Sequence, residues 1–285
     1  MGPSQSLLLL LALSLSSTLT SSTDYSALVF KGCADQNFQN FNAQALKTLF
    51  DSLISQSSAA KFYKTTSDTV NGLFQCRGDL SGADCRNCVE KAPNLAQKLC
   101  GQAIAARVQL NGCYLRYEIA GFRQVSGVEL LYKICGSNRA SGTGFGDRLD
   151  LALGEVVKGV TGGGGGFYAG AYESVYVLGQ CEGDLSGGDC VNCVKNAIDK
   201  AKSVCGNALS AQIYLQTCFI SYTYYPNGVP TTNQPSFSPS GTRWNTEKII
   251  AVALGGIVGI GLVAACLLFT KSAFKKKHRA YKYGG

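Results

Sequence analysis

Twelve of the thirteen cysteines fall into two copies of one spacing, and this repetition limits what the chain can fold into more than any other feature. From the second cysteine of each copy onward, the steps are nine, three, twelve and thirteen residues in both copies. The two copies are Cys33, Cys76, Cys85, Cys88, Cys100 and Cys113, then Cys135, Cys181, Cys190, Cys193, Cys205 and Cys218. A duplicated unit of six cysteines predicts two small domains, each with its own crosslinks.

The repeat extends beyond the cysteines. Residues 75–89, QCRGDLSGADCRNCV, return as residues 180–194, QCEGDLSGGDCVNCV. Each unit is about 100 residues long, which is an ordinary size for one domain. We therefore expect a first domain at residues 24–125 and a second at residues 128–225.

The two ends of the chain predict passage into, and anchorage in, a membrane. Residues 1–23 contain an apolar run that is too short to span a bilayer and is typical of a signal peptide. Residues 226–247 hold Pro, Ser and Thr and predict an extended stalk. Residues 248–270 are long and apolar enough for a transmembrane helix, and the basic tail at 271–285 places the cysteine-rich part outside the cell. The expected topology is single-pass, type I.

The net charge of +8 does not indicate a nucleic-acid partner. Seven of the 26 basic residues lie from Lys248 onward, which leaves 19 against the 18 acidic residues upstream. The positive charge is therefore a juxtamembrane cluster, which stops translocation and attracts anionic lipid. We expect the membrane to be a partner and nucleic acid not to be one.

Hydrophobic periodicity predicts an α+β fold in each unit. A short β-rich segment at 28–30 precedes helical spacing at 43–54, and a strand candidate leads into Cys76. Two alternating strands close the unit, at 107–110 and 114–117. Helices packed on an antiparallel sheet give the α+β class.

A second helix is predicted between Cys85 and Cys100, with its equivalent in the second unit. Asp84 and Asp189 are the expected N-caps of these two helices. Pro93 is expected to bend or shorten the helix of the first unit only.

The chain contains few groups that could perform catalysis. The only histidine is His278 in the predicted cytosolic tail, so a Ser-His-Asp site, a Cys-His site or a histidine-ligated metal is excluded outside the cell. Cys85-x-x-Cys88 and Cys190-x-x-Cys193 suggest zinc or thiol redox chemistry, but an oxidising compartment favours structural disulfides. Six cysteines allow 15 pairings, which spacing does not resolve. We predict no enzyme activity, no catalytic residue, no metal and no cofactor.

The spacing C-x8-C-x2-C, at Cys76-Cys85-Cys88 and again in the second unit, resembles the plant salt-stress-response/antifungal domain typified by the ginkgo seed lectin ginkbilobin. Two such domains followed by a stalk, one span and a short tail are similar to the plasmodesmata-located protein family. The cysteine-rich receptor-like kinases share this kind of ectodomain but continue into a kinase.

The resemblance implies two helices packed on a five-stranded antiparallel sheet in each domain. It also implies the pairs Cys33–Cys100, Cys76–Cys85, Cys88–Cys113, Cys135–Cys205, Cys181–Cys190 and Cys193–Cys218. For function, it implies residence in the plasma membrane at plasmodesmata, control of cell-to-cell movement through callose deposition, and roles in plant defence or viral movement.

The lectin relative contacts mannose through an Asn, an Arg and a Glu. The matching positions in the first unit hold Ala34, Arg107 and Glu118, so Arg107 and Glu118 form a degenerate candidate glycan site. The positions in the second unit, Gly136, Gln212 and Thr223, retain none of the three. An Arg–Glu pair on neighbouring strands is also an ordinary surface ion pair.

Two features of the predicted span could serve association or anchorage. Ala251, Gly255 and Gly259 recur every four residues and form a candidate helix-packing face. Cys266, near the cytosolic end, is either an acylation site or an inert membrane thiol.

The sequence thus predicts a non-enzymatic plasmodesmal membrane protein that regulates cell-to-cell movement through extracellular interactions. The expected partners are related membrane proteins or receptor kinases, in homo- or hetero-association, and a cell-wall glycan or viral movement protein. One alternative is a membrane-tethered lectin that senses cell-wall or microbial glycan. A second alternative is a thiol oxidoreductase, which would keep Cys85 and Cys88 free or easily reduced.

Overall fold

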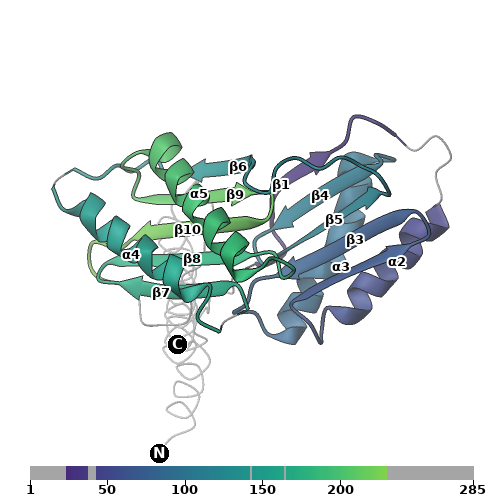
Figure 1. Ribbon diagram of the computed structural model, residues 1–285, viewed down its shortest axis with the longest axis horizontal. Coiled ribbons are helices and arrows are strands. Elements are labelled where there is room, and N and C mark those ends of the chain that lie inside the picture. Colours follow the sequence, from purple (N-terminus) through teal and green to yellow (C-terminus); the bar gives the residue numbers. More distant parts are fainter. Residues whose placement is uncertain (1–23, 38–42, 142, 164, 230–285) are drawn as a thin grey trace, which may run out of the picture. The chain divides into compact units, whose positions relative to one another are not determined.

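The two sequence repeats fold as two copies of one architecture in the computed structural model, which describes residues 24–37, 43–141, 143–163 and 165–229 (Figure 1). The first copy consists of β1 (Leu28–Cys33), α2 (Ala43–Gln56), β2 (Phe62–Ser67), β3 (Val70–Cys76), α3 (Gly82–Cys100), β4 (Ala105–Leu110) and β5 (Cys113–Ile119). The second consists of β6 (Leu130–Cys135), α4 (Phe145–Gly159), β7 (Phe167–Tyr172), β8 (Val175–Cys181), α5 (Gly187–Cys205), β9 (Ser210–Leu215) and β10 (Cys218–Tyr224).

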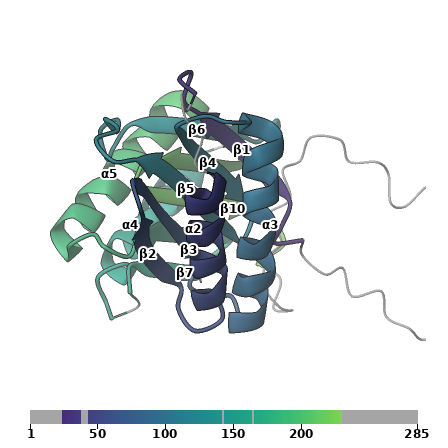
Figure 2. The ribbon, with the colours of Figure 1, turned by 90° about the vertical axis from the view of Figure 1, so that its right-hand side faces the viewer.

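Each copy is a five-stranded antiparallel sheet with two helices, as predicted. The strand orders are β1-β4-β5-β3-β2 and β6-β9-β10-β8-β7, so the second topology repeats the first strand for strand. In the first copy, α2 packs on β2 and β3 and α3 packs on β4 and β5 (Figure 2). Because α2 and α3 also contact each other, they form one layer over one face of the sheet.

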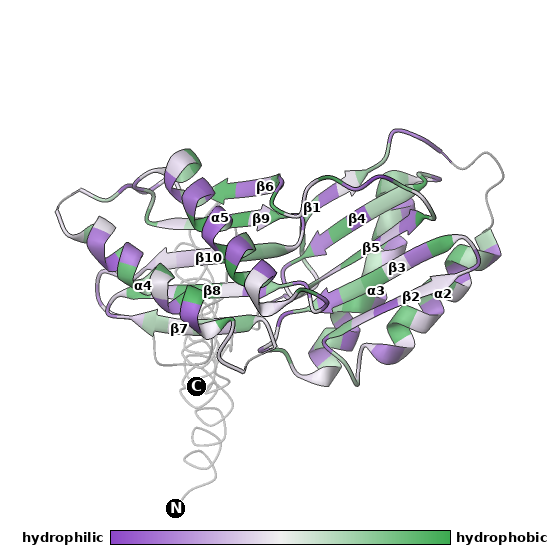
Figure 3. Cartoon of the chain, in the orientation of Figure 1, coloured by the Kyte–Doolittle hydropathy of each residue, from purple (hydrophilic) through white to green (hydrophobic). Residues whose placement is uncertain are grey.

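Each domain has a hydrophobic core of its own. Leu46, Leu49 and Leu53 of α2 are buried, as the helical spacing predicts. Their cluster contains residues of the first copy only, and the corresponding cluster around α4 contains residues of the second copy only. Along α4 and α5, hydrophilic and hydrophobic stretches alternate, which is the pattern of helices half-covered by a sheet (Figure 3).

The long helices begin differently from the prediction. The N-caps of α3 and α5 are Ser81 and Ser186, whose hydroxyls accept from the backbone N–H of Asp84 and Asp189 at 3.0 and 3.2 Å. Each aspartate lies inside the first turn, where its carboxylate accepts from the serine hydroxyl. Serine and aspartate both favour helix starts. The serine hydroxyl caps the backbone N–H three residues later, and the residue at that position is the aspartate.

The sequence predicts that Pro93 bends or shortens α3, and the structure shows that it does not shorten this helix. Both α3 and α5 contain 19 residues, although only α3 has an internal proline. Pro93 is buried on the core-facing side of the helix. Packing against the sheet therefore outweighs the loss of one backbone hydrogen bond.

Removing a cap should weaken the fold measurably. We expect Ser81→Ala and Ser186→Ala each to lower the free energy of unfolding by about 1 kcal/mol, because each leaves a backbone N–H of the first turn without its acceptor. Urea denaturation would give the shift. Ser203→Ala is the control, since Ser203 lies in α5 and its hydroxyl donates only to the Lys200 carbonyl one turn earlier. Equal midpoints for all three variants would contradict the capping role.

Candidate functional site at the junction of the two domains

Successive side chains of β4 and β5 point to opposite faces of the sheet. One set faces the helices, and the other set lies on the face away from them. Val108 and Leu115 point into the core. Arg107 and Arg116 lie on the opposite face, and the strand register places them directly across from each other. Two guanidinium groups at facing positions of an antiparallel pair repel each other unless anions lie nearby.

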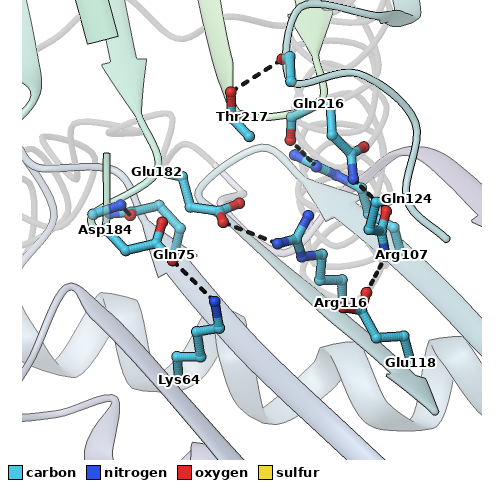
Figure 4. A network of polar contacts seen from close by, with 12 residues as sticks. Lys64, Gln75, Arg107, Arg116, Glu118, Gln124, Glu182, Asp184, Gln216 and Thr217 are labelled. Atoms are coloured by element: carbon cyan, nitrogen blue, oxygen red, sulfur yellow. Dashed lines mark hydrogen bonds and ion pairs between the residues drawn. The ribbon is translucent and has the colours of Figure 1, made fainter. Parts of the chain in front are cut away.

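Arg107 connects the first domain to the second. Its side chain is largely buried, at 8% exposure, and Nη1 donates to the backbone carbonyl of Gln216 at 2.7 Å (Figure 4). Nη2 donates to Oε1 of Gln109 at 3.3 Å, and the guanidinium lies 3.9 Å from the centre of the Tyr114 ring. Nε has no hydrogen-bond acceptor among the described residues. Burial lowers the pKa of Arg107 from its ordinary value.

Glu182 of the second domain reaches into the first domain. Its carboxylate pairs with Nη2 of Arg116 at 3.0 Å and accepts a hydrogen bond from the Tyr114 hydroxyl. The Glu182 side chain is almost fully buried, so desolvation raises its pKa above the ordinary value, against the opposing effect of Arg116. Lys64 and Asp184 form a further, more exposed pair between the domains at 3.1 Å.

Two equivalent glutamines form reciprocal contacts across the junction. Oε1 of Gln75 accepts from the backbone N–H of Gly183 at 2.8 Å, and Oε1 of Gln180 accepts from the backbone N–H of Gly78 at 2.9 Å. Gln75 and Gln180 occupy the same repeat position, as do the two glycines. The domains therefore associate with approximate two-fold symmetry within one chain.

The same two glycines are needed for close approach. A β-carbon on Gly78 would lie 2.5 Å from the Phe167 ring, and one on Gly183 would lie 2.6 Å from the Phe62 ring. Phe62 and Phe167 are themselves repeat equivalents, at the start of β2 and β7. At a third pair of equivalent positions, Phe30 stacks on Tyr132 with ring centres 5.0 Å apart.

A pocket of about 240 Å³ opens beside this junction, on the face of the first sheet that carries Arg107. Its floor is made by small residues, Gly32, Ala34 and Ala105. Its walls include Phe122 and Gln124 of the segment between the domains, and Gln216 and Leu131 of the second domain. The pocket is complete only when both domains are in place.

All three positions that match the lectin's sugar contacts line this pocket: Ala34, Arg107 and Glu118. They do not form a shared contact. Arg107 is directed to the Gln216 carbonyl, and Glu118 accepts a hydrogen bond from the amide of Gln124. Gln216 in turn donates to Gln124 at 2.6 Å, so these groups form one polar network with the linker (Figure 4).

The cysteines pair within each unit in the structure. The bonds are Cys33–Cys100, Cys76–Cys85, Cys88–Cys113, Cys135–Cys205, Cys181–Cys190 and Cys193–Cys218, which are the six pairs that the family resemblance implies. Cys85 and Cys88 are thus bonded to different partners and not to each other. That arrangement differs from a redox C-x-x-C motif, in which the two cysteines alternate between dithiol and disulfide.

The remaining predicted features lie outside the described residues. These features are Ala251, Gly255, Gly259 and Cys266, together with the predicted signal peptide and span. Among the described residues, no helix has the length and apolar character required to cross a membrane. The described part of the chain also contains no group of three His, Cys, Asp or Glu side chains that could hold a metal ion.

Of the residues that join the domains, the sequence singled out only Arg107, and as a candidate glycan contact. Glu182 occupies the position that holds Arg77 in the first repeat, and this reversal of charge within an otherwise repeated segment was the available signal. Arg77 pairs with Asp79 in its own domain, whereas Glu182 pairs across the junction. A difference between repeats marks a position at which the two domains have different neighbours.

The model of the salt stress response/antifungal family matches residues 32–120 and 134–225, one range in each domain. Over 282 residues, the chain is 51% identical to plasmodesmata-located protein 2 of Arabidopsis thaliana, and the match covers 92% of each chain. The chain belongs to the plasmodesmata-located protein family. Plasmodesmata-located protein 1 of the same plant is 49% identical over 279 residues, which are 90% of this chain and 91% of that one.

A solved structure of this family has the same tandem architecture. The crystal structure of the tandem DUF26 ectodomain of the Arabidopsis thaliana cysteine-rich receptor-like protein PDLP8 superposes with a TM-score of 0.64 at 30% identity. The match covers 70% of this chain and 98% of the PDLP8 chain. This chain and PDLP8 therefore share the tandem arrangement of two domains.

Proposed function

We propose that this protein acts at plasmodesmata as a non-enzymatic, single-pass membrane protein that regulates movement between cells. The observation that carries the proposal is the identity of 51% to plasmodesmata-located protein 2 over nearly the whole of both chains. The predicted signal peptide, stalk, span at 248–270 and basic tail supply the membrane topology. Six disulfides among the described residues suit domains that face an oxidising compartment.

The extracellular domains would act by binding. Each is crosslinked three times and has a separate core, so the pair presents a rigid surface to the cell wall. The partners proposed are a related membrane protein or receptor kinase, and the output is a change in callose deposition and permeability. Roles in defence and in viral movement would follow from control of the same channel.

Location and permeability test the proposal together. We expect the full-length protein with a fluorescent tag after residue 285 to collect in paired foci across walls between plant cells. Raised and lowered expression should change, in opposite directions, the number of neighbouring cells that a free fluorescent protein reaches, with a parallel change in callose staining. A variant lacking residues 248–270 is the control and should lose the foci. Uniform signal over the plasma membrane, or unchanged spread of the reporter, would contradict the proposal.

A membrane-tethered lectin is the second candidate, favoured by the pocket that contains Arg107 and Glu118. It receives less support because Ala34 has no amide to bind a sugar hydroxyl. Arg107 also donates to the Gln216 carbonyl, so the group that contacts sugar in the lectin relative joins the two domains here.

A further inference from the structure

The pocket at the junction is open in the first domain, where its floor has only the small residues Gly32, Ala34 and Ala105. A β-carbon placed on Gly32 would meet nothing within 4 Å, and Gly32 lies on the edge strand β1. The second domain has Ile134 at the same repeat position, and there a β-carbon on Gly136 would lie 2.4 Å from the Ser210 hydroxyl. The equivalent positions of the second domain therefore carry a larger side chain at 134 and have less free space at 136.

The charges at this pocket are not balanced among the described residues. Arg107 and Arg116 face each other across β4 and β5. Of the carboxylates that the structure describes, only Glu182 lies within ion-pair distance of either, and it pairs with Arg116. Within the described part of the chain, Arg107 has a carbonyl, an amide oxygen and aromatic rings as neighbours, but no carboxylate at ion-pair distance. Glu118 lines the same pocket, and its carboxylate accepts from the Gln124 amide.

A buried guanidinium with no carboxylate at ion-pair distance lowers the stability of the folded protein. Arg107 is more than nine-tenths buried, and its Nε has no acceptor among the described residues. A guanidinium held in this state gains more from a carboxylate than an exposed one does, because the bond is charge-assisted and weakly screened. The apolar part of the site is formed by Phe122, Leu131 and the small floor residues.

We propose that this pocket binds a small organic carboxylate, with the anion toward Arg107 and Arg116 and an apolar body against Phe122 and the Gly32–Ala34 floor. The volume of about 240 Å³ is below the range of about 300–1,000 Å³ typical of drug-sized ligands, so the ligand is a compact one. Because Leu131 and Gln216 come from the second domain, a bound ligand contacts both domains and favours their association. A carboxylate ligand goes beyond the proposed function, whose second candidate assigns a sugar to the same pocket.

Binding of benzoate to the full-length protein in nanodiscs tests the site, with benzamide as the uncharged analogue of the same shape. Ligand-observed NMR should show saturable binding of benzoate and at least tenfold weaker binding of benzamide. Gly32→Val should reduce benzoate affinity at least tenfold, since valine suits a strand and its side chain fills the pocket floor. Ile134→Val, at the equivalent position of the second domain, is the matched control and should bind benzoate as the unmodified protein does.

Three results would overturn the proposal. Equal binding of benzoate and benzamide would show that the two arginines do not recognise the negative charge of the ligand. Benzoate binding that survives Gly32→Val, in a protein whose thermal unfolding is unchanged, would place the ligand elsewhere. Binding of mannose without binding of benzoate would assign the pocket to neutral sugars. None of these results depends on where the protein resides, so they leave the plasmodesmal proposal to its own test.

Discussion

Replacing Cys33 and Cys100 together by alanine is expected to lower the free energy of unfolding of the first domain by about 4 kcal/mol. The bond joins residues separated by 67 positions, and a crosslink that closes a long loop removes much conformational entropy from the unfolded chain. Loss of about 4 kcal/mol would leave a domain of this size with little stability, because such domains are stable by about 5–15 kcal/mol. Guanidinium denaturation of purified protein measures the change.

The repeat supplies the controls for this experiment. Cys135→Ala with Cys205→Ala opens a loop of nearly equal length, with a separation of 70, and should cost the second domain as much. Removal of Cys76–Cys85, with a separation of 9, should cost about 2.5 kcal/mol through the same entropy. If the short bridge proved more stabilising than the long one, loop entropy would not be the main contribution, and burial of Cys76 and Cys85 in the core would be the better explanation.

The hydrophobic periods predicted the α+β class of each domain, and the family resemblance supplied the five-stranded sheet. Leu46, Leu49 and Leu53 recur at helical spacing, and the structure buries all three on α2. The edge strands β2 and β7 were not located from the residues, because Phe62 to Ser67 is only half-buried and alternates weakly. An edge strand pairs on one side, so its sequence is less constrained than that of a central strand.

The junction between the domains could not be predicted in the same way. Gln75 and Gln180 are part of the repeated segment, and nothing in their local sequence indicates that each accepts from the backbone of the other domain. The contact depends on how two finished domains associate, which periodicity and propensity do not encode. Arg107 illustrates the consequence, since family resemblance suggested a sugar contact and the structure shows a bond to Gln216.

Removing the carboxylate of Glu182 should have the second large effect. Glu182→Ala is expected to destabilise the protein by about 3 kcal/mol, because it leaves the largely buried Arg116 and Tyr114 without their shared partner. Calorimetry should show the single unfolding transition of the associated domains separating into two. Asp51→Ala is the control, since it breaks the exposed Lys47–Asp51 pair on α2 and should cost less than about 0.5 kcal/mol. An equal loss in the two variants would show that the Glu182 contacts add nothing beyond a surface ion pair.

The same carboxylate should make the stability of the junction depend on pH in a direction opposite to that of most carboxylates. Burial raises the pKa of Glu182 above its ordinary value of 4.5, and Asp184 adds to the effect, while Arg116, Tyr114 and Arg107 oppose it. The folded protein therefore binds this proton more tightly than the unfolded chain does. The resulting contribution to the free energy of unfolding is full below pH 4.5 and is lost as pH rises through the folded pKa. Glu182→Gln keeps the shape but cannot titrate, and the difference in unfolding free energy between the two proteins should change with pH in this window. A difference that stays constant from pH 4 to pH 7 would mean that Glu182 titrates alike in the folded and unfolded chains, and that Arg116 and Tyr114 offset the whole cost of its burial.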